Sequence, residues 1–142
     1  MICLRGASEV AADVLNKTAS PDLRVEVVWL PILKTDNEEA AAASAGRLTD
    51  PRAHHFFNPD GEIGREAARA MRFAPDVELA WDVYLLYDPD VRWEAGRPMP
   101  PPTAWMQRLK ENDPHWMNTG LLLRAIKALL PAATTSVAPV AH

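Results

Sequence analysis

The sequence has few of the residues on which several common protein classes depend. It contains one cysteine, Cys3, among 142 residues, which excludes an internal disulfide, a four-cysteine zinc site and a self-contained dithiol centre. No apolar run approaches the roughly 20 residues that a membrane-spanning helix needs. The charged and then apolar segments of a secretory signal do not follow Met1 either. We therefore expect no membrane span.

The chain also has fewer basic than acidic residues. Lys and Arg total 15 against 19 Asp and Glu, so the net charge is −4. A chain of this charge has no general attraction for nucleic acid or anionic lipid. We therefore expect no nucleic-acid partner.

The sequence patterns of common cofactor and metal sites are missing as well. Gly61 and Gly64 do not complete the glycine spacing of a dinucleotide-binding or phosphate-binding loop. His54 and His55 are adjacent, so on a strand they would point to opposite faces, and His115 is distant in sequence. Because a zinc site needs about three protein ligands, we expect neither a metal site nor a bound cofactor.

The residues that are present indicate a globular protein rich in proline. The chain is 48% hydrophobic and 24% charged, which are the proportions of a folded domain. Most of its 13 prolines fall between periodic segments, where they mark the ends of elements. We predict one domain over residues 1–130, followed by a flexible tail over residues 131–142.

Local patterns predict alternating helices and strands. Apolar residues at helical spacing, capping residues and helix-favouring alanines predict helices over residues 7–15, 35–46, 63–73, 103–109 and 121–130. Thr35 with Glu38 reads as a capping box for the second of these helices. Apolar β-branched or alternating runs predict strands over residues 23–33, 54–58, 79–87 and 91–94.

The order of these elements predicts an α/β protein. The strand over residues 23–33 is too apolar to have one wet face, which is typical of parallel strands covered on both sides. Asp88-Pro89-Asp90 predicts a turn that pairs the last two strands as an antiparallel hairpin. We therefore expect a largely parallel sheet that ends in a hairpin.

This order and four local segments resemble the thioredoxin-like fold, in its peroxiredoxin-like and thiol-reductant branches. The segment from Cys3 to Ala7 resembles the end of the cysteine motif of those families, and Val25–Trp29 resembles the strand that follows. Phe56–Gly64 resembles their short aromatic and Asp-Pro-Asp-Gly-like segment, and Val83–Asp90 their later strand and turn. The resemblance implies a three-layer sandwich with a mostly parallel sheet and a carboxyl-terminal antiparallel hairpin.

The chain departs from that family pattern in two places. The strand that should precede the cysteine is missing, because only two residues come before Cys3. In this fold that strand lies in the middle of the sheet, so we expect two neighbouring strands with unpaired edges. We hypothesise that the chain is truncated at its amino end, which in-frame sequence upstream of Met1 would test. The families' cis-proline is also missing, since Ala80 and Trp81 stand near its place.

Three residues are candidates for a catalytic site. The resemblance places Cys3 at a helix N-terminus, where the helix dipole lowers the pKa of a thiol, and Arg5 would add positive charge nearby. The alternative is that Cys3 is a small buried or frayed terminal residue. Asp82 is the one charge in its apolar strand, so it is a candidate proton acceptor beneath the thiol. Alternatively, Asp82 faces the sheet edge or bonds a backbone amide.

The resemblance implies a thiol-based function. The leading prediction is a thiol–disulfide oxidoreductase or a peroxide-handling relative that acts through Cys3, with a thiol or disulfide protein as its partner. The alternative is a catalytically silent domain that binds a protein partner through its aromatic carboxyl half, which includes Trp105, Met106 and Trp116. A third interpretation is a homodimer in which the neighbouring copy supplies the missing strand.

Overall fold

A computed structural model of the protein describes residues 2–131. The predicted tail over residues 131–142 lies outside this range except for Pro131. The helices are α1 (Ile2–Asp13), the 3-10 helix η1 (Leu15–Lys17), α2 (Glu38–Ala45), α3 (Glu62–Ala70) and α4 (Thr119–Leu129). The strands are β1 (Val25–Trp29), β2 (Ala53–Phe57), β3 (Val83–Leu86) and β4 (Ala104–Gln107). The chain is therefore an α/β protein, as predicted.

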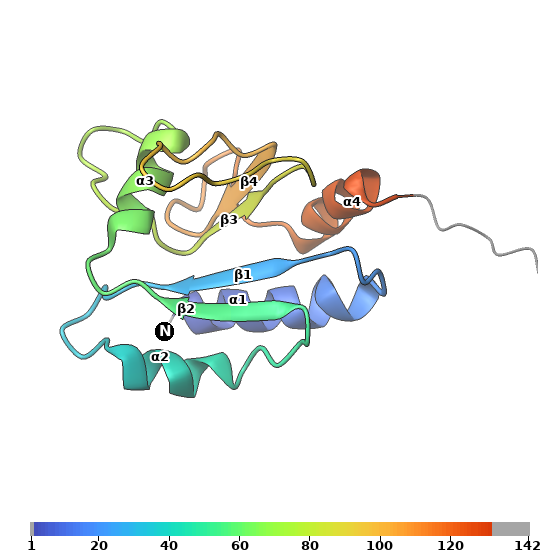
Figure 1. Ribbon diagram of the computed structural model, residues 1–142, viewed down its shortest axis with the longest axis horizontal. Coiled ribbons are helices and arrows are strands. Elements are labelled where there is room, and N and C mark those ends of the chain that lie inside the picture. The colour runs from blue at the N-terminus through green and yellow to red at the C-terminus, as the bar shows by residue number, and fades with distance from the viewer. Residues whose placement is uncertain (1, 132–142) are drawn as a thin grey trace, which may run out of the picture.

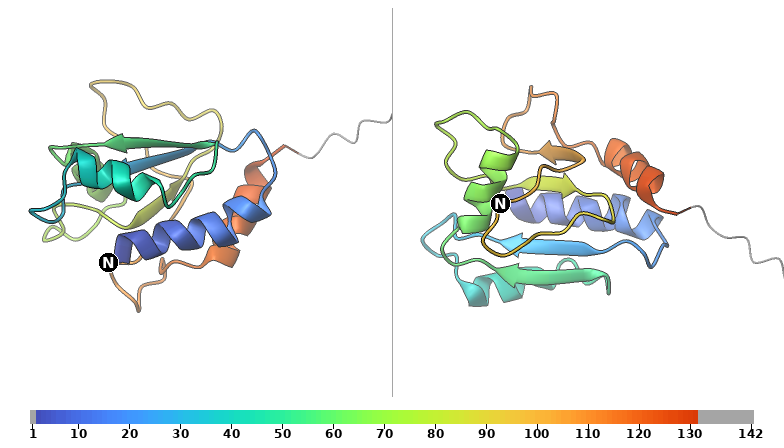
Figure 2. Two further views of the ribbon diagram at one scale, coloured as in Figure 1. Left: turned by 90° about the horizontal axis from the view of Figure 1, so that it is seen from below. Right: turned by 45° about the horizontal axis from the view of Figure 1, so that its top comes forward.

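The four described strands form a parallel pair and an antiparallel pair. Strand β1 pairs with β2 in parallel, and β3 pairs with β4 in antiparallel fashion. The strands follow one another across the molecule in the order β2, β1, β3, β4 (Figures 1 and 2). Within residues 2–131, no ladder joins β1 to β3.

The β3–β4 pair is packed on both faces. Tyr84 and Leu86 of β3 contact a core cluster in which the end of α1 meets α4, around Val14 and Ile126. The alternate residues of β3 contact a second cluster built on α3, whose buried members are Ala67, Ala68, Met71 and Ala80. Side chains that alternate between two cores explain why the sequence of β3 is apolar throughout.

The β1–β2 pair has one packed face and one partly open face. On the packed face Trp29 stacks on His55 and donates from Nε1 to Nδ1 at 3.2 Å. On the opposite face Glu26, His54 and Phe56 are exposed. The prediction that the strand around β1 is covered on both sides is therefore wrong at Glu26.

Helices α2 and α4 begin at asparagine caps. The Asn37 side chain accepts a hydrogen bond from the Ala40 N–H at 2.9 Å, so the predicted capping box at Thr35 is wrong. Helix α2 stops at Gly46 as predicted. The Asn118 side chain caps α4 in the same way, by accepting a hydrogen bond from the Leu121 N–H at 2.9 Å.

The region after α3 differs most from the prediction. The strand expected over residues 79–87 is reduced to β3, because Asp82 adopts a left-handed conformation with φ of 51°. Residues 91–94 do not form a strand, and the partner of β3 is β4, where a helix was predicted. The Thr103 hydroxyl, at the start of the segment predicted as a helix, donates to Asp88 Oδ2 at 2.8 Å.

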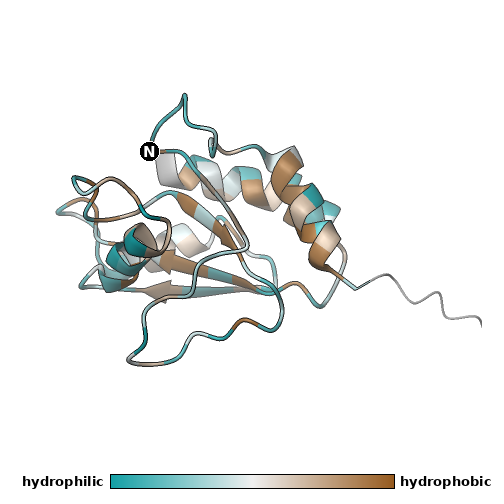
Figure 3. Ribbon diagram, turned by 90° about the horizontal axis from the view of Figure 1, so that it is seen from above, coloured by the Kyte–Doolittle hydropathy of each residue, from teal (hydrophilic) through white to brown (hydrophobic). Residues whose placement is uncertain are grey.

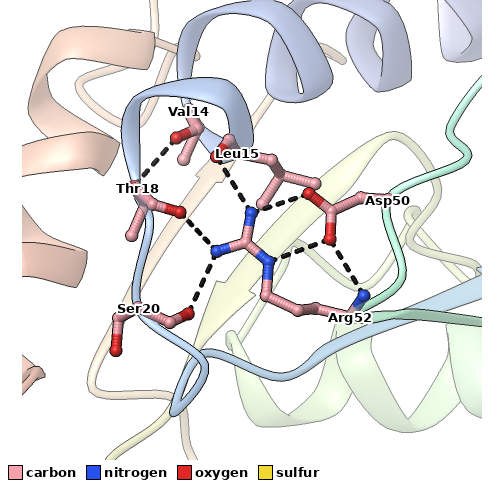
Figure 4. A network of polar contacts seen from close by, with 6 residues as sticks. All are labelled: Val14, Leu15, Thr18, Ser20, Asp50 and Arg52. Atoms are coloured by element: carbon pink, nitrogen blue, oxygen red, sulfur yellow. Dashed lines mark hydrogen bonds and ion pairs between the residues drawn. The ribbon is translucent and has the colours of Figure 1, made fainter.

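A partly buried arginine ties η1 and the turn after it to the start of β2. Arg52 forms a two-pronged ion pair with Asp50, with Nη2 at 2.7 Å from Oδ2 and Nε at 2.8 Å from Oδ1 (Figure 4). Its remaining donors reach the carbonyls of Leu15, Thr18 and Ser20. The hydrogen bonds from Arg52 lower the pKa of Asp50 to about 2. This network fixes the turn between η1 and β1.

Candidate functional site

Cys3 and Arg5 both lie in the first turns of α1. The helix begins at Ile2, so it starts five residues earlier than predicted and includes Cys3 as its second residue. The Arg5 side chain is 76% exposed and pairs with Glu9, with Nε and Oε1 2.9 Å apart. Arg5 therefore directs its charge at a carboxylate one turn further along the helix.

Asp82 lies at the point where the chain enters β3. Its Oδ1 accepts a hydrogen bond from the Tyr84 hydroxyl at 2.8 Å. Its Oδ2 is buried and has no hydrogen-bond partner among the described residues. Burial raises the pKa of Asp82, and the bond from Tyr84 offsets this only in part. The backbone-amide bond considered as an alternative for Asp82 is therefore replaced by this bond from a hydroxyl.

The Asp82–Tyr84 pair lies directly against α1 at Gly6. A Cβ atom at Gly6 would overlap the Tyr84 hydroxyl and would lie 3.0 Å from Asp82 Oδ1. Glycine is therefore required for the close approach of the helix to these two polar side chains. Gly6 follows Cys3 by three residues in the same helix, so the structure brings the acid and the first turns of α1 together.

Arg108 adds a cation on the same side of the β3–β4 pair. Its backbone N–H donates to the Asp82 carbonyl at 3.0 Å, and its Nη2 donates to Glu9 Oε2 on α1. The guanidinium also lies 5.5 Å from the centre of the Trp116 ring. Its Nε is buried without a hydrogen-bond partner among the described residues. Burial lowers the pKa of Arg108, and the nearby charge of Arg5 adds to this effect.

Glu9, Asp82, Tyr84 and Arg108 together form what we call the α1 polar cluster. Two of its buried atoms, Asp82 Oδ2 and Arg108 Nε, are unpartnered among the described residues, and such atoms are rare in folded proteins. An acid with a raised pKa can hold a proton that it exchanges with a neighbouring group. A buried guanidinium with an unused N–H can hold an anion. The cluster is therefore suited to proton transfer beside α1.

Sequence reasoning found Asp82 and missed the rest of the cluster. Asp82 was recognisable as the one charge in an apolar segment. Arg108 falls in a segment predicted as a helix, and the structure replaces that helix with β4 and the turn after it. Glu9 and Arg108 are 99 residues apart, so no local spacing pattern could indicate that they meet.

Three of the remaining residues singled out from the sequence, His55, His115 and Trp105, have partners within the protein. His54 is exposed, whereas Nε2 of His55 lies 3.0 Å from the Leu48 carbonyl, so the two point to opposite faces as predicted. His115 stacks on Trp105 with ring centres 3.6 Å apart. Trp105 also contacts Phe73 edge-on.

Residues 2–131 contain no group of three or more His, Cys, Asp or Glu side chains placed to hold a metal ion. No helix in this range has the length and apolar character needed to cross a membrane.

Comparison with known proteins supplies no relative for this chain. No protein-family model, no curated protein and no solved structure matches it. The function is therefore argued from the residues of the chain and from their geometry.

Proposed function

We propose that the protein is a thioredoxin-like thiol protein that acts through Cys3 as a thiol–disulfide oxidoreductase or a peroxide-handling relative. One observation carries the proposal: the half-buried acid Asp82, with an unpartnered Oδ2 and a raised pKa, lies against the same first turns of α1 that contain Cys3. A thiol at a helix start and a proton-holding acid nearby are the two groups that thiol exchange needs.

The edges of the strands support the thioredoxin-like fold. The Val25 N–H donates to the Arg52 carbonyl, and the Trp29 carbonyl accepts from the Asn58 N–H, so both of these β1 residues bond toward the β2 side. Because backbone groups alternate along a strand, the N–H and C=O groups of Glu26 and Val28 point to the opposite edge of β1. This edge lies on the side of β3 in Figure 1.

The facing edge of β3 is arranged in the same way. The Asp82 carbonyl bonds to Arg108 at the end of the β3–β4 ladder, so the alternation of the ladder turns Val83 and Leu85 away from β4. In the thioredoxin-like fold the strand before the cysteine lies in the middle of the sheet. Without this middle strand, the thioredoxin-like fold would have two strand edges that share no ladder. The facing edges of β1 and β3 fit this arrangement, because no ladder joins these two strands within residues 2–131.

The proposed exchange reaction needs a thiol from another molecule to complete its cycle. The Cys3 thiolate attacks one sulfur of a partner's disulfide, the partner's S–S bond breaks, and a mixed disulfide forms. The departing partner thiolate takes up a proton, and we assign Asp82, whose pKa is raised, as the acid that exchanges this proton. Because the chain contains one cysteine, a thiol from another molecule must then attack the mixed disulfide and release Cys3 as a thiolate.

The pH dependence of Cys3 alkylation tests this proposal. We expect iodoacetamide to react with a midpoint below the free-thiol pKa of about 8.5. We expect Asp82→Asn to shift this midpoint, and Asp90→Asn, an exposed control in a turn, to leave it unchanged. Exchange with a glutathione mixed disulfide should be lost in Cys3→Ser. A midpoint near the free-thiol value together with no exchange would overturn the proposal.

The alternative of a silent binding domain has less support. Its aromatic residues are used inside the protein, because Trp105 packs against Phe73 and His115, and Trp116 lies under Arg108. An unreactive Cys3 in the alkylation experiment would favour this alternative.

A further inference from the structure

Helix α3 and the loop that follows it form a cationic cleft. The cleft has a volume of about 400 Å³ and is lined by three arginines, Arg65, Arg69 and Arg72, and by a single acid, Glu78. Phe73 and small apolar residues form the rest of its wall. Figure 3 shows the strongly hydrophilic character of α3 beside the more apolar strands. This local excess of positive charge stands out in a chain whose net charge is −4.

The three arginines differ in how far the protein already uses them. Arg65 and Arg69 are four residues apart and lie on one face of α3, whereas Arg72 follows the end of the helix and lines the same cleft. Arg65 donates from Nη1 to the Asp60 carbonyl at 2.9 Å, and Arg69 forms an ion pair with Glu66. Arg72 makes no side-chain hydrogen bond or ion pair with another described residue. Its guanidinium is therefore available to a ligand.

The backbone at Arg72 gives a second reason to assign this side chain a role. Arg72 has φ of 55° and follows α3 in a Schellman motif, in which the Phe73 N–H donates to the Ala68 carbonyl at 3.0 Å. Glycine is the residue that this position favours, because a side chain there is strained. An arginine at a position where glycine fits more easily supports a role for its side chain.

We propose that this cleft binds a small phosphate monoester that carries an apolar or aromatic group. Guanidinium groups bind phosphate oxygens through pairs of charge-assisted hydrogen bonds, and a dianion draws on more than one arginine. Phe73 and the neighbouring apolar wall offer a surface for the non-polar part of the ligand. The site is separate from Cys3 and the α1 polar cluster, so it does not depend on the proposed thiol function.

Titration of the full chain with phenyl phosphate, followed by NMR chemical shifts, tests this proposal. We expect saturable binding in the millimolar range or tighter, with shifts confined to α3 and residues 72–78, and weaker binding of inorganic phosphate. Arg72→Gly should weaken binding about tenfold, the loss expected for a charge-assisted hydrogen bond. It should also leave the melting temperature unchanged or raised, because glycine relieves the backbone strain.

Two further variants separate a built site from general charge attraction. Glu78→Gln removes the one acid in the lining and should tighten binding several-fold. Arg124→Ala removes an exposed arginine of α4, outside the cleft, and should leave the affinity unchanged. Equal weakening by Arg72→Gly and Arg124→Ala would overturn the proposal. So would the absence of saturation, or an affinity for phenyl phosphate no higher than that for inorganic phosphate.

Discussion

The contact between α1 and the Asp82–Tyr84 pair makes Gly6→Ala a sharp test of the site geometry. The new Cβ would overlap the Tyr84 hydroxyl, and it would lie 3.0 Å from both Tyr84 Cζ and Asp82 Oδ1. Tyr84 packs against the core cluster around Val14, so its ring has little freedom to move aside. The helix must therefore shift away from β3, or the bond between Tyr84 and Asp82 must break.

The expected loss of stability follows from two opposing effects. Overpacking of a filled site costs about 1–3 kcal/mol. Replacing a helical glycine by alanine returns up to about 1 kcal/mol, through the lower backbone entropy of the unfolded chain. We therefore expect Gly6→Ala to lower the free energy of unfolding by about 1–2 kcal/mol, which for a chain of this length lowers the melting temperature by about 3–6 °C.

Urea unfolding followed by circular dichroism measures this change against a matched glycine. A Cβ at Gly120 in α4 would lie 3.3 Å from Asn118 Oδ1 and 3.9 Å from Arg124 Nη1, without a backbone clash. Gly120→Ala should therefore be neutral or stabilising by up to about 1 kcal/mol.

A double-mutant cycle identifies the atom responsible for the cost. Tyr84→Phe removes the hydroxyl that a Cβ at position 6 would overlap, so Gly6→Ala should cost less when combined with Tyr84→Phe than in the wild type. If Gly6→Ala stabilises the protein, or costs the same in both backgrounds, α1 does not approach β3 as closely as this geometry requires.

Two carboxylates with opposite pKa shifts give opposite pH dependences of stability. The pKa of Asp50 is lowered from 3.8 to about 2, so its contribution is present above pH 3.8 and lost as the pH falls toward 2. We expect Asp50→Asn to cost about 1–2 kcal/mol at pH 7, discounted for its place near the surface, and little at pH 2. Asp82 has a raised pKa, so its ionisation destabilises the folded state as the pH rises above 3.8. The free energy of unfolding of Asp82→Asn, compared with that of the wild type, should therefore rise from pH 4 to pH 7, as measured by urea unfolding at each pH.

Elements whose signals are local were predictable from the sequence. The four α-helices within residues 2–131 and strands β1 and β2 were predicted from the sequence, because helical spacing and short apolar runs indicate which face of an element is buried. The end of α2 at Gly46 was found for the same local reason.

Elements that depend on distant contacts were not predictable. Trp105 and Met106 on β4 alternate between the two core clusters, but four residues are too few to separate a strand from one helical turn. Strand β3 is shorter than predicted because Asp82 turns the chain with a positive φ, which its apolar neighbours do not reveal. The position of Arg108 in the site depends on both of these features.

Attaching α1 to the β3–β4 pair through the α1 polar cluster lowers the stability of the fold compared with apolar packing. A buried polar atom without a hydrogen bond costs stability, and buried ion pairs are often replaceable by apolar residues without loss. Val10 of α1 packs against the apolar cluster around Val14 and Ile126, so apolar side chains also hold this helix against α4. An acid and a guanidinium with unused buried atoms, placed where Gly6 lets the helix approach, are what the proposed chemistry at the first turns of α1 would require. This makes Asp82→Asn informative in both assays, because a structural residue would alter stability but leave the pH midpoint of Cys3 alkylation unchanged.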